Sequence, residues 1–388
     1  MMKNKKARVV ALYLPQYHPI PENDKWWGKG FTEWTNVGRA KPLFKGHYQP
    51  RVPADLGYYD LRVPEVREQQ AELAKEAGIE GFCYYNYYFG NGRMLLQRPL
   101  REMLASGKPD FPFCICWANH TWSNKTWEKS SSMVKESVLI EQTYGGEKDY
   151  TEHFYSLLDA FRDPRYMKVD GKLLFVVYDV LIAYHDAATF VKVWRKLAAE
   201  NGLPDFHFVA MMPSTCSYRI SEKGEHIPAP PNLKSSSELF NYALNQGFDA
   251  VNSFGKRRGE LISRGILTNY IDKCLGILGV HTLKYDYLKT VNNYFAPEDS
   301  WENVYPTILP QWDRTARVGK ADGVYVDSTP KRFKEHVLKA LEFIRGKSDE
   351  HKILFLKSWN EWAEGNYLEP DLKYGHGYID ALKEAIED

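Results

Sequence analysis

Two carboxylates near the C-terminus offer the clearest chemistry in this sequence. Glu361 and Glu364 stand three positions apart within residues 358–365, directly after the apolar run 353–356. If the chain turns helically there, both side chains face the same way, within several ångströms of each other. Glycoside hydrolysis typically needs two such groups, one protonated towards the leaving oxygen and one ionised. The pair therefore predicts acid–base catalysis at a glycosidic bond.

The neighbours of the pair favour the same chemistry. Trp359 and Trp362 flank it, and apolar walls disfavour a nearby charge, so at least one carboxyl pKa should be raised. Asn360 offers a hydrogen bond to a sugar hydroxyl. The alternative is a solvated acidic turn beside core tryptophans. The position at the exit of an apolar strand favours the catalytic interpretation.

Aromatic and amide side chains recur at the ends of the other apolar runs. Aromatic planes stack on the apolar faces of sugar rings, and amides bind hydroxyl groups. Few cations accompany them, so the set suits a neutral polyhydroxylated ligand better than a phosphate. Each residue alone fits core packing equally well, and only their co-occurrence favours binding. The predicted substrate-binding residues at strand ends are Tyr13, Gln16, Tyr17, His18, Tyr85, Tyr87, Trp117, Asn119, Trp122, Tyr178, Asp179, Gln311 and Trp312, with Asn86, His120 and Asp313 beside them.

The long segment after the first apolar run adds three more candidates. Glu33, Trp34 and Asn36 lie in a loop rich in Trp, Pro and Gly. We expect them to reach over the binding site as a subsite wall. The alternative is an Ω-loop packed by its own aromatic side chains.

The elements that must position these residues are short apolar runs alternating with helical stretches. The runs are 8–15, 81–88, 113–119, 173–179, 206–211, 248–254, 305–313 and 353–362, and helical periodicity marks 64–77, 150–161, 187–201 and 330–345. Eight βα units predict an α/β fold, a single (β/α)₈ TIM barrel over residues 1–388. The long loops 16–59, 119–150 and 214–240 follow strands and should lie on its C-terminal face. A doubly wound open sheet is the alternative, but no glycine-rich nucleotide turn follows the first run.

Composition excludes several other functions. The 388 residues include 51 Lys and Arg against 50 Asp and Glu, a net charge of +1, which favours neither nucleic acid nor an anionic membrane. The five cysteines are scattered, and the histidines lack metal-ligand spacing, so we predict no disulfide framework, metal or cofactor. The apolar run 9–14 is too short for a signal peptide or a membrane span. A cytoplasmic location is expected, and nothing indicates an oligomeric state.

Several motifs resemble a known family over about residues 7–385. The matching stretches are 11–18 (ALYLPQYH), 30–36 (GFTEWTN), 81–85 (GFCYY), 117–119 (WAN) and 359–365 (WNEWAEG). They resemble the WbsX-like group, labelled glycosyltransferase in bacterial polysaccharide (O-antigen) gene clusters. That group is similar to glycoside hydrolase family 99, the endo-α-mannosidases and mannanases.

The family-99 resemblance implies roles for the carboxylates. Its pattern Asn-Glu-Trp-His-Glu-Gly matches here except that Ala363 replaces the His, which leaves mannose specificity unsupported. Glu361 would deprotonate the sugar's own 2-hydroxyl, which then displaces the leaving group. Glu364 would protonate the leaving oxygen and later activate the incoming water or sugar. The anomeric configuration would be retained.

Three functions fit these observations. The first is a retaining glycoside hydrolase-like enzyme acting on an oligosaccharide or a bacterial polysaccharide. The second is a glycosyltransferase in O-antigen, lipopolysaccharide or capsule synthesis, which a cytoplasmic location would favour. The third is a non-catalytic glycan-binding protein, in which both glutamates would be structural.

Overall fold

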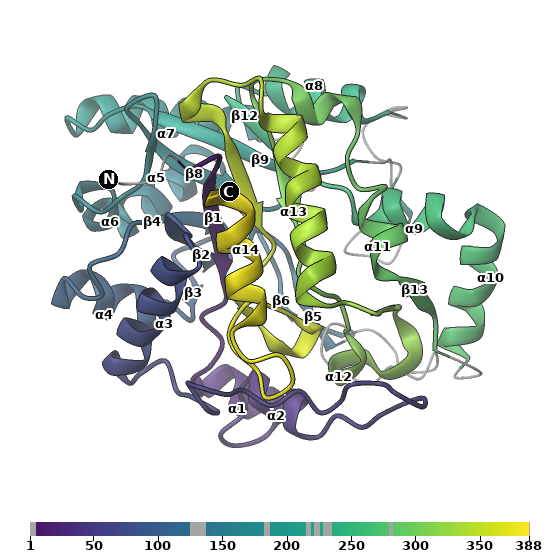
Figure 1. Cartoon of the computed structure of the whole chain (residues 1–388). Coiled ribbons are helices and arrows are strands. Elements are labelled where there is room, and N and C mark those ends of the chain that lie inside the picture. The colour runs from purple at the N-terminus through teal and green to yellow at the C-terminus, as the bar shows by residue number, and fades with distance from the viewer. Residues whose placement is uncertain are drawn as a thin grey trace.

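Eight parallel strands close into a barrel in the computed structural model, which describes residues 5–124, 137–181, 187–214, 219–220, 226–227, 235–278 and 282–387. The barrel strands, in chain order, are β1 (Arg8–Tyr13), β2 (Gly81–Tyr88), β4 (Phe113–Trp117), β8 (Lys172–Val177), β9 (Phe206–Pro213), β12 (Ala250–Phe254), β14 (Val304–Ile308) and β16 (Ile353–Leu356). Each pairs with the next in parallel, and β1 pairs with both β2 and β16, which closes the barrel (Figure 1). The (β/α)₈ prediction is confirmed, and the open doubly wound sheet is excluded.

The strand sequences explain why the barrel forms. Each of the eight predicted apolar runs overlaps a barrel strand, and nearly every residue of these strands is buried. Such runs suit a parallel sheet whose two faces are both covered, because neither face then has to be polar. The register is continuous around the closure, where Ala11 lies between Leu356 and Phe82.

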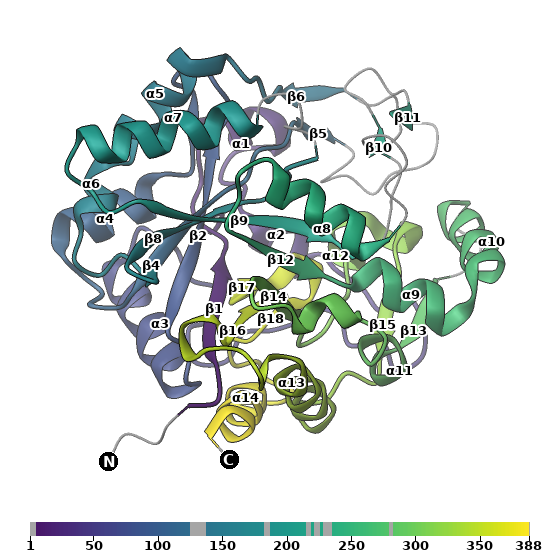
Figure 2. The same cartoon turned by 90° about the horizontal axis from the view of Figure 1, so that it is seen from above.

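Helices surround the strands, as the view along the barrel shows (Figure 2). The main outer helices are α3 (Pro64–Glu76), α4 (Arg98–Ser106), α5 (Gly146–Ser156), α7 (Ala187–Glu200), α8 (Ser236–Asn245), α13 (Pro330–Ile344) and α14 (Gly377–Glu387). The helices predicted over 64–77, 187–201 and 330–345 are confirmed. The single helix predicted over 150–161 is wrong, because α5 ends at Ser156 and α6 (Leu158–Arg162) follows. Leu157, with φ −114°, separates the two helices.

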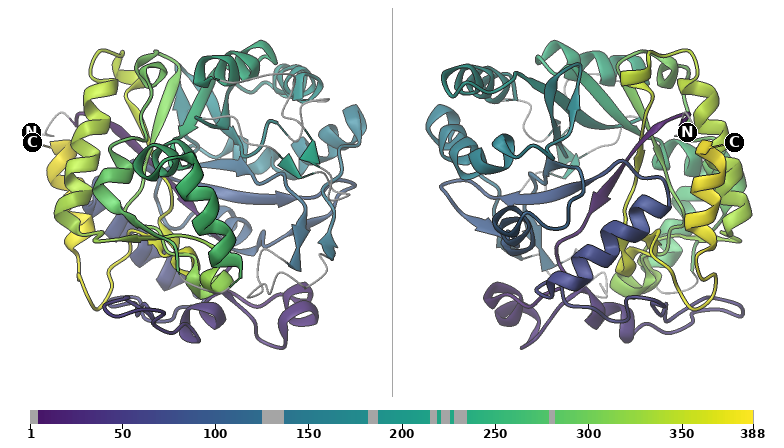
Figure 3. Two further views of the ribbon diagram at one scale, coloured as in Figure 1. Left: turned by 90° about the vertical axis from the view of Figure 1, so that its right-hand side faces the viewer. Right: turned by 60° about the vertical axis from the view of Figure 1, so that its left-hand side comes forward.

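The loops on the C-terminal side carry short elements of their own. The segment with α1 (Pro21–Trp27) and α2 (Glu33–Gly38) lies across one end of the barrel (Figure 3). β3 (Met94–Leu95) follows β2, and β5 (Trp122–Ser123) pairs with β6 (Val138–Ile140) in the predicted loop 119–150. Most of the predicted loop 214–240 lies outside the described residues, apart from β10 (Arg219–Ile220) and β11 (His226–Ile227).

Two further insertions follow later strands. After β12 come α9 (Lys256–Arg264), α10 (Ile266–Ile277), β13 (Lys284–Asp286) and α11 (Tyr287–Val291), a segment that the sequence analysis did not single out. After β14 come α12 (Thr315–Val318) and β15 (Val324–Val326). Within the described ranges, every helix is too short or too polar to cross a membrane.

Candidate active site

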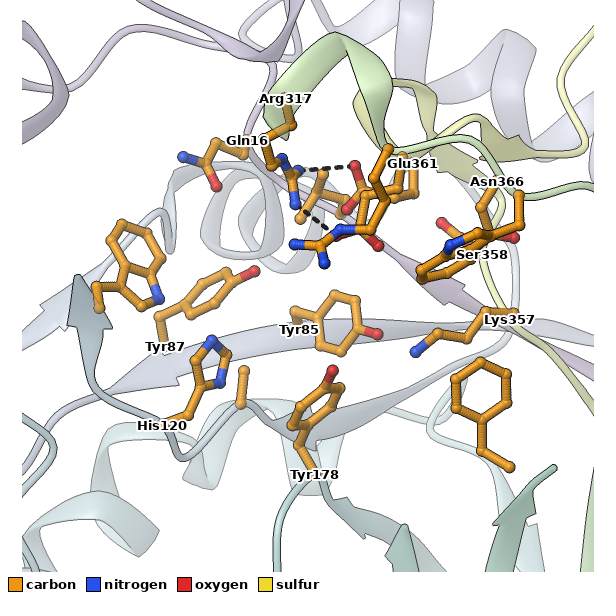
Figure 4. Close-up of a pocket in the computed structure, with 17 residues that line it drawn as sticks. Gln16, Tyr85, Tyr87, His120, Tyr178, Arg317, Lys357, Ser358, Glu361 and Asn366 are labelled. Atoms are coloured by element: carbon orange, nitrogen blue, oxygen red, sulfur yellow. Dashed lines mark hydrogen bonds and ion pairs between the residues drawn. The ribbon is translucent and has the colours of Figure 1, made fainter. Parts of the chain in front are cut away.

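A cavity of about 260 Å³ opens where the barrel strands end, and both Glu361 and Glu364 line it (Figure 4). Its walls come from the exits of β1, β2, β4, β8, β12, β14 and β16, as expected for a barrel active site. The lining residues are Leu14, Gln16, Tyr85, Tyr87, Ala118, His120, Trp122, Tyr178, Phe254, Trp312, Arg314, Arg317, Lys357, Ser358, Glu361, Glu364 and Asn366.

The exit of β16 is fixed to the exit of β1, which sets the direction of the two carboxylates. The amide of Asn360 accepts a hydrogen bond from Leu14 N (2.8 Å) and donates one to the Leu14 carbonyl (3.0 Å). A hairpin of β17 (Asn360–Glu361) and β18 (Asn366–Tyr367) then surrounds the 3₁₀ turn Trp362–Glu364. Asn360, predicted to bind sugar, is thus fully buried and bonded to backbone.

Gly365 closes this turn in the left-handed region, with φ +56°. A Cβ atom there would come within 2.8 Å of Asp313 Cβ and 3.0 Å of Arg51 Nε. Only glycine meets both conditions without displacing its neighbours. The backbone N–H of Asp313 in turn donates to the Glu364 carbonyl (2.7 Å), so the turn that presents Glu364 is held from outside the cavity.

One guanidinium group joins three carboxyl groups at the cavity wall. Arg317 Nη1 lies 2.7 Å from Glu364 Oε1, and Nη2 lies 3.0 Å from Glu361 Oε1 and 2.8 Å from Glu33 Oε1. Arg314 Nε adds a second contact of 3.0 Å to Glu364. Glu33, predicted as a subsite wall, is fully buried and meets the pair through Arg317.

These contacts and the burial set the protonation of the three acids. Burial raises the pKa of Glu361 well above its usual range, and Arg317 only partly opposes this. Burial also raises the pKa of Glu33, to about 7. Burial acts in the same direction on Glu364, but Arg314, Arg317 and Lys357 outweigh it and lower its pKa. The surroundings therefore act in opposite directions on the pair, favouring the protonated form of Glu361 and the ionised form of Glu364.

Six predicted binding residues line the cavity: Gln16, Tyr85, Tyr87, Trp122, Tyr178 and Trp312. Burial raises the pKa of all three tyrosines, so each remains a hydroxyl donor. Neither polar atom of the buried Gln16 amide has a hydrogen-bond partner among the described residues, and the same holds for the Trp312 Nε1 atom. Polar groups left unpaired inside a protein are costly unless a ligand satisfies them.

Other predicted residues lie behind the cavity wall and support it. Tyr17, Trp34 and Trp362 form an aromatic cluster beneath the pair, with Trp34 centroids 4.7 Å from Tyr17 and 5.5 Å from Trp362. The Tyr17 hydroxyl donates to the Asn360 carbonyl (2.6 Å) and accepts from Trp362 N (3.1 Å). Tyr17 and Trp362 are buried and Trp34 is half-buried, and none of the three lines the cavity, so these rings stabilise the turn that carries Glu361.

The remaining predicted residues make contacts within the protein and do not line this cavity. The Asn119 amide donates to the Asp179 carbonyl and accepts from the Asp179 backbone N–H, and the buried Trp117 donates from Nε1 to the Tyr88 carbonyl. Asn36 accepts from Arg39, and Gln311 accepts from Arg51. Tyr13 and Trp359 pack against Phe82, and the Tyr13 hydroxyl donates to Gln70 of the outer helix α3, whereas His18 lines a separate surface pocket.

The cations are what the sequence analysis missed. It expected few of them at the strand ends, but Arg314, Arg317 and Lys357 all line the cavity, which corrects that expectation. Lys357 stands next to the motif 358–365, and both arginines follow the seventh predicted run. Their closeness in sequence to predicted strand ends was therefore the only sequence feature that could have identified them as cavity residues. Within the ranges that the structure describes, no group of three or more His, Cys, Asp or Glu could hold a metal ion.

Solved structures with a similar fold are glycoside hydrolases by their descriptions. One described as a glycoside hydrolase-like protein aligns with a TM-score of 0.55 and 16% identity, over 100% of this chain and 95% of its own. The GH99 endo-α-mannosidase from Bacteroides thetaiotaomicron aligns with a TM-score of 0.54 and 14% identity, over 98% and 96%. At these identities the likeness is one of fold.

Sequence relatives place the chain in a family. The uncharacterized protein WxcX of two strains of Xanthomonas campestris pv. campestris is 34% and 33% identical over 385 residues, 98% of this chain. The chain spans about half the length of these relatives. Residues 9–382 match the family described as Glycosyltransferase WbsX. This chain therefore belongs to the WbsX family of carbohydrate-active enzymes.

Proposed function

We propose that this enzyme cleaves or transfers at a glycosidic bond of a bacterial polysaccharide, with Glu361 and Glu364 as the catalytic pair. The observation that carries the proposal is the cavity itself. Two carboxyl groups whose pKa values are shifted in opposite directions line it, and three tyrosine hydroxyls face the same space. Acid–base cleavage of a glycoside needs such a pair beside bound hydroxyls.

The lining fits a sugar in both its polar and its apolar parts. The amides of Gln16 and Asn366 have no hydrogen-bond partner among the described residues and are buried, so a hydroxyl group can bind each of them. Trp122 and Trp312 offer apolar planes for the ring faces. A sugar would therefore satisfy polar groups that the protein leaves unpaired.

The reaction follows the roles implied by family 99. Glu361 takes the proton of the 2-hydroxyl, whose oxygen attacks the anomeric carbon, while Glu364 gives a proton to the departing glycosidic oxygen. Glu364 then removes a proton from water or from a sugar hydroxyl, which opens the three-membered ring, and the 2-oxygen regains its proton from Glu361. Each carboxyl group returns to its starting state, and the configuration is retained.

These roles require the proton to change place within the pair. The pKa directions favour the proton on Glu361, whereas the reaction begins with Glu364 protonated. A 2-hydroxyl that donates to Glu361 favours its ionised form, and a glycosidic oxygen near Glu364 favours the acid. We propose that substrate binding makes this exchange, since one proton suffices for both arrangements.

Transfer to a sugar acceptor is the second candidate, because the family is described as a glycosyltransferase. The same two glutamates can activate a sugar hydroxyl in place of water. A cytoplasmic location, still a prediction, would favour this synthetic direction. Ala363 brings no hydrogen-bonding side chain, so neither candidate is assigned to mannose.

Turnover of defined glycans tests the proposal. The protein is incubated with bacterial polysaccharides and oligosaccharides, alone and with nucleotide sugars, and products are identified by mass spectrometry. The E361Q and E364Q variants should each lose about 10²–10⁴ in rate, and E342Q, an exposed glutamate on α13, should lose none. Full activity of E364Q would overturn the assignment.

Leaving-group dependence separates the two roles. A dinitrophenyl glycoside of the sugar that is turned over needs no proton for its departing group. E364Q should therefore retain much of its rate on this substrate, while E361Q loses it. The opposite result would exchange the roles. Nucleotide release that depends on Glu361 would establish the transferase, and glycan binding without any turnover would favour a binding protein.

A further inference from the structure

Lys357 places in the cavity a cation that forms no ion pair with either glutamate of the catalytic pair. It follows the last residue of β16, and its backbone N–H donates to the Ile308 carbonyl (3.0 Å). The side chain is 6% exposed, and it extends from the strand exit towards the space between Tyr85 and Tyr178 (Figure 4). The strand pairing thus fixes the base of the side chain and points its ammonium group into the cavity.

The ammonium group of Lys357 lacks a partner of opposite charge. No carboxylate or other acceptor of the described residues lies within hydrogen-bonding or ion-pair distance of Nζ, whose nearest partners are the rings of Phe254 and Tyr178 at 4.7 and 5.4 Å. Ring faces compensate a cation only in part. Burying a charge without an ionic partner is costly, and a hydroxyl group compensates it less well than an anion does.

The carboxylates that could neutralise Lys357 are engaged elsewhere. Arg317 and Arg314 both contact Glu364, and Arg317 also contacts Glu361. Arg317 also contacts Glu33, and Arg314 also contacts Asp322, so both arginines are neutralised within the protein. An anion beside Lys357 would supply the counter-charge that the described residues do not give it.

We propose that Lys357 binds the carboxylate of an acidic sugar, such as a hexuronic acid, within the substrate. This inference rests on the proposed function, since it names the class of glycan that the cavity takes. A single lysine between two aromatic walls matches one negative charge on a ring-sized group. A phosphate is usually held by several donors, such as arginine forks or the N–H groups of a helix N-terminus, and the two arginines here are already paired.

Binding of matched acidic and neutral glycans tests this inference without requiring turnover. The E361Q variant, in which Glu364 still pairs with Arg314 and Arg317, is screened on an array of oligouronides, the same oligosaccharides after carboxyl reduction, and sugar phosphates. Dissociation constants of the bound glycans are measured by calorimetry. The acidic form should bind about 10- to 100-fold more tightly than its carboxyl-reduced form, as for a charge-assisted hydrogen bond.

The K357Q substitution in the same background should abolish this preference, while K357R retains part of it. The control is K352Q, since Lys352 precedes β16 at the opposite end of the barrel and pairs with Asp349. Equal binding of acidic and carboxyl-reduced glycans, or no acidic glycan bound, overturns the inference even if K357Q fails to fold. Tighter binding of sugar phosphates than of oligouronides would overturn the proposal that Lys357 binds a carboxylate. A preference for acidic over carboxyl-reduced glycans that is lost in K357Q supports the inference. If the wild-type protein then turns over no glycan, the proposed catalytic function fails but the inference about Lys357 stands.

Discussion

Arg317 donates a hydrogen bond of 3.0 Å to Glu361, although 44 positions separate the two residues. Arg317 lies on α12, after β14, whereas Glu361 lies after β16, and the two strands are neighbours in the barrel. The same guanidinium reaches Glu33 from the first long loop and Glu364. One cation therefore joins Glu33, from the N-terminal part of the chain, to the neighbouring acids Glu361 and Glu364 near its C-terminus.

Replacing Arg317 by Met should destabilise the protein by about 3–5 kcal/mol, because breaking a buried ion pair leaves charges uncompensated. Loss of the cation raises the pKa of the three acids in the folded state. The loss in free energy of unfolding should therefore grow as pH rises from 5 to 8. Urea unfolding at several pH values measures both effects. R62M is the control, since Arg62 forms an exposed pair with Asp60, worth at most about 1 kcal/mol. A loss for R317M no larger than the control's would contradict the prediction.

Glu33 should make the protein less stable as pH rises. Its folded-state pKa is about 7 against 4.5 for the free side chain, so its stabilising contribution is complete below pH 4.5. That contribution is lost as pH rises through about 7, by up to about 3 kcal/mol. Relative to wild type, the E33Q variant should therefore gain free energy of unfolding between pH 4.5 and 8. The E342Q variant, at an exposed position, should show no such trend. A difference in free energy of unfolding between E33Q and wild type that does not change with pH would refute the argument.

Gly365 should tolerate no side chain. In G365A the methyl group would need φ +56° and would lie 2.8 Å from Asp313 Cβ. We expect a loss of about 1–3 kcal/mol in stability and about 10²-fold in turnover, because displacing the turn moves Glu364. Gly346 has open space around its Cβ position and no positive φ, so G346A serves as the control. Wild-type turnover of G365A would show that the turn is not needed to position Glu364.

Gln16 and Gln70 allow a matched test of binding against folding. Both are buried, but Gln70 bonds to Tyr13 and Glu369, whereas the Gln16 amide has no partner among the described residues. Q16M should therefore leave the melting temperature unchanged or raise it, while KM rises about tenfold or more. Q70M should lower the melting temperature by several degrees with little change in KM. Similar behaviour of the two variants would remove Gln16 from the binding site.

The strands and the central acidic motif could be predicted because their signals are local. Each apolar run carries its own β-propensity and burial, and eight of them alternating with helices leave few architectures. Glu361 and Glu364 were identified because their strand and their spacing lie in one short segment. The break at Leu157, which divides α5 from α6, has no comparable pattern in the sequence.

The sequence by itself determined the barrel and the motif with the two glutamates, since both depend on neighbouring residues. The tertiary structure decided which strand-end side chains face the cavity: Tyr85, Tyr87 and Tyr178 do, whereas Tyr13, Trp117 and Trp359 are buried elsewhere. It also decided the charges around the pair, because Arg317 meets Glu361 only when β14 and β16 pair. Electrostatic interactions depend on distance in space, and the order of residues in the chain does not give that distance.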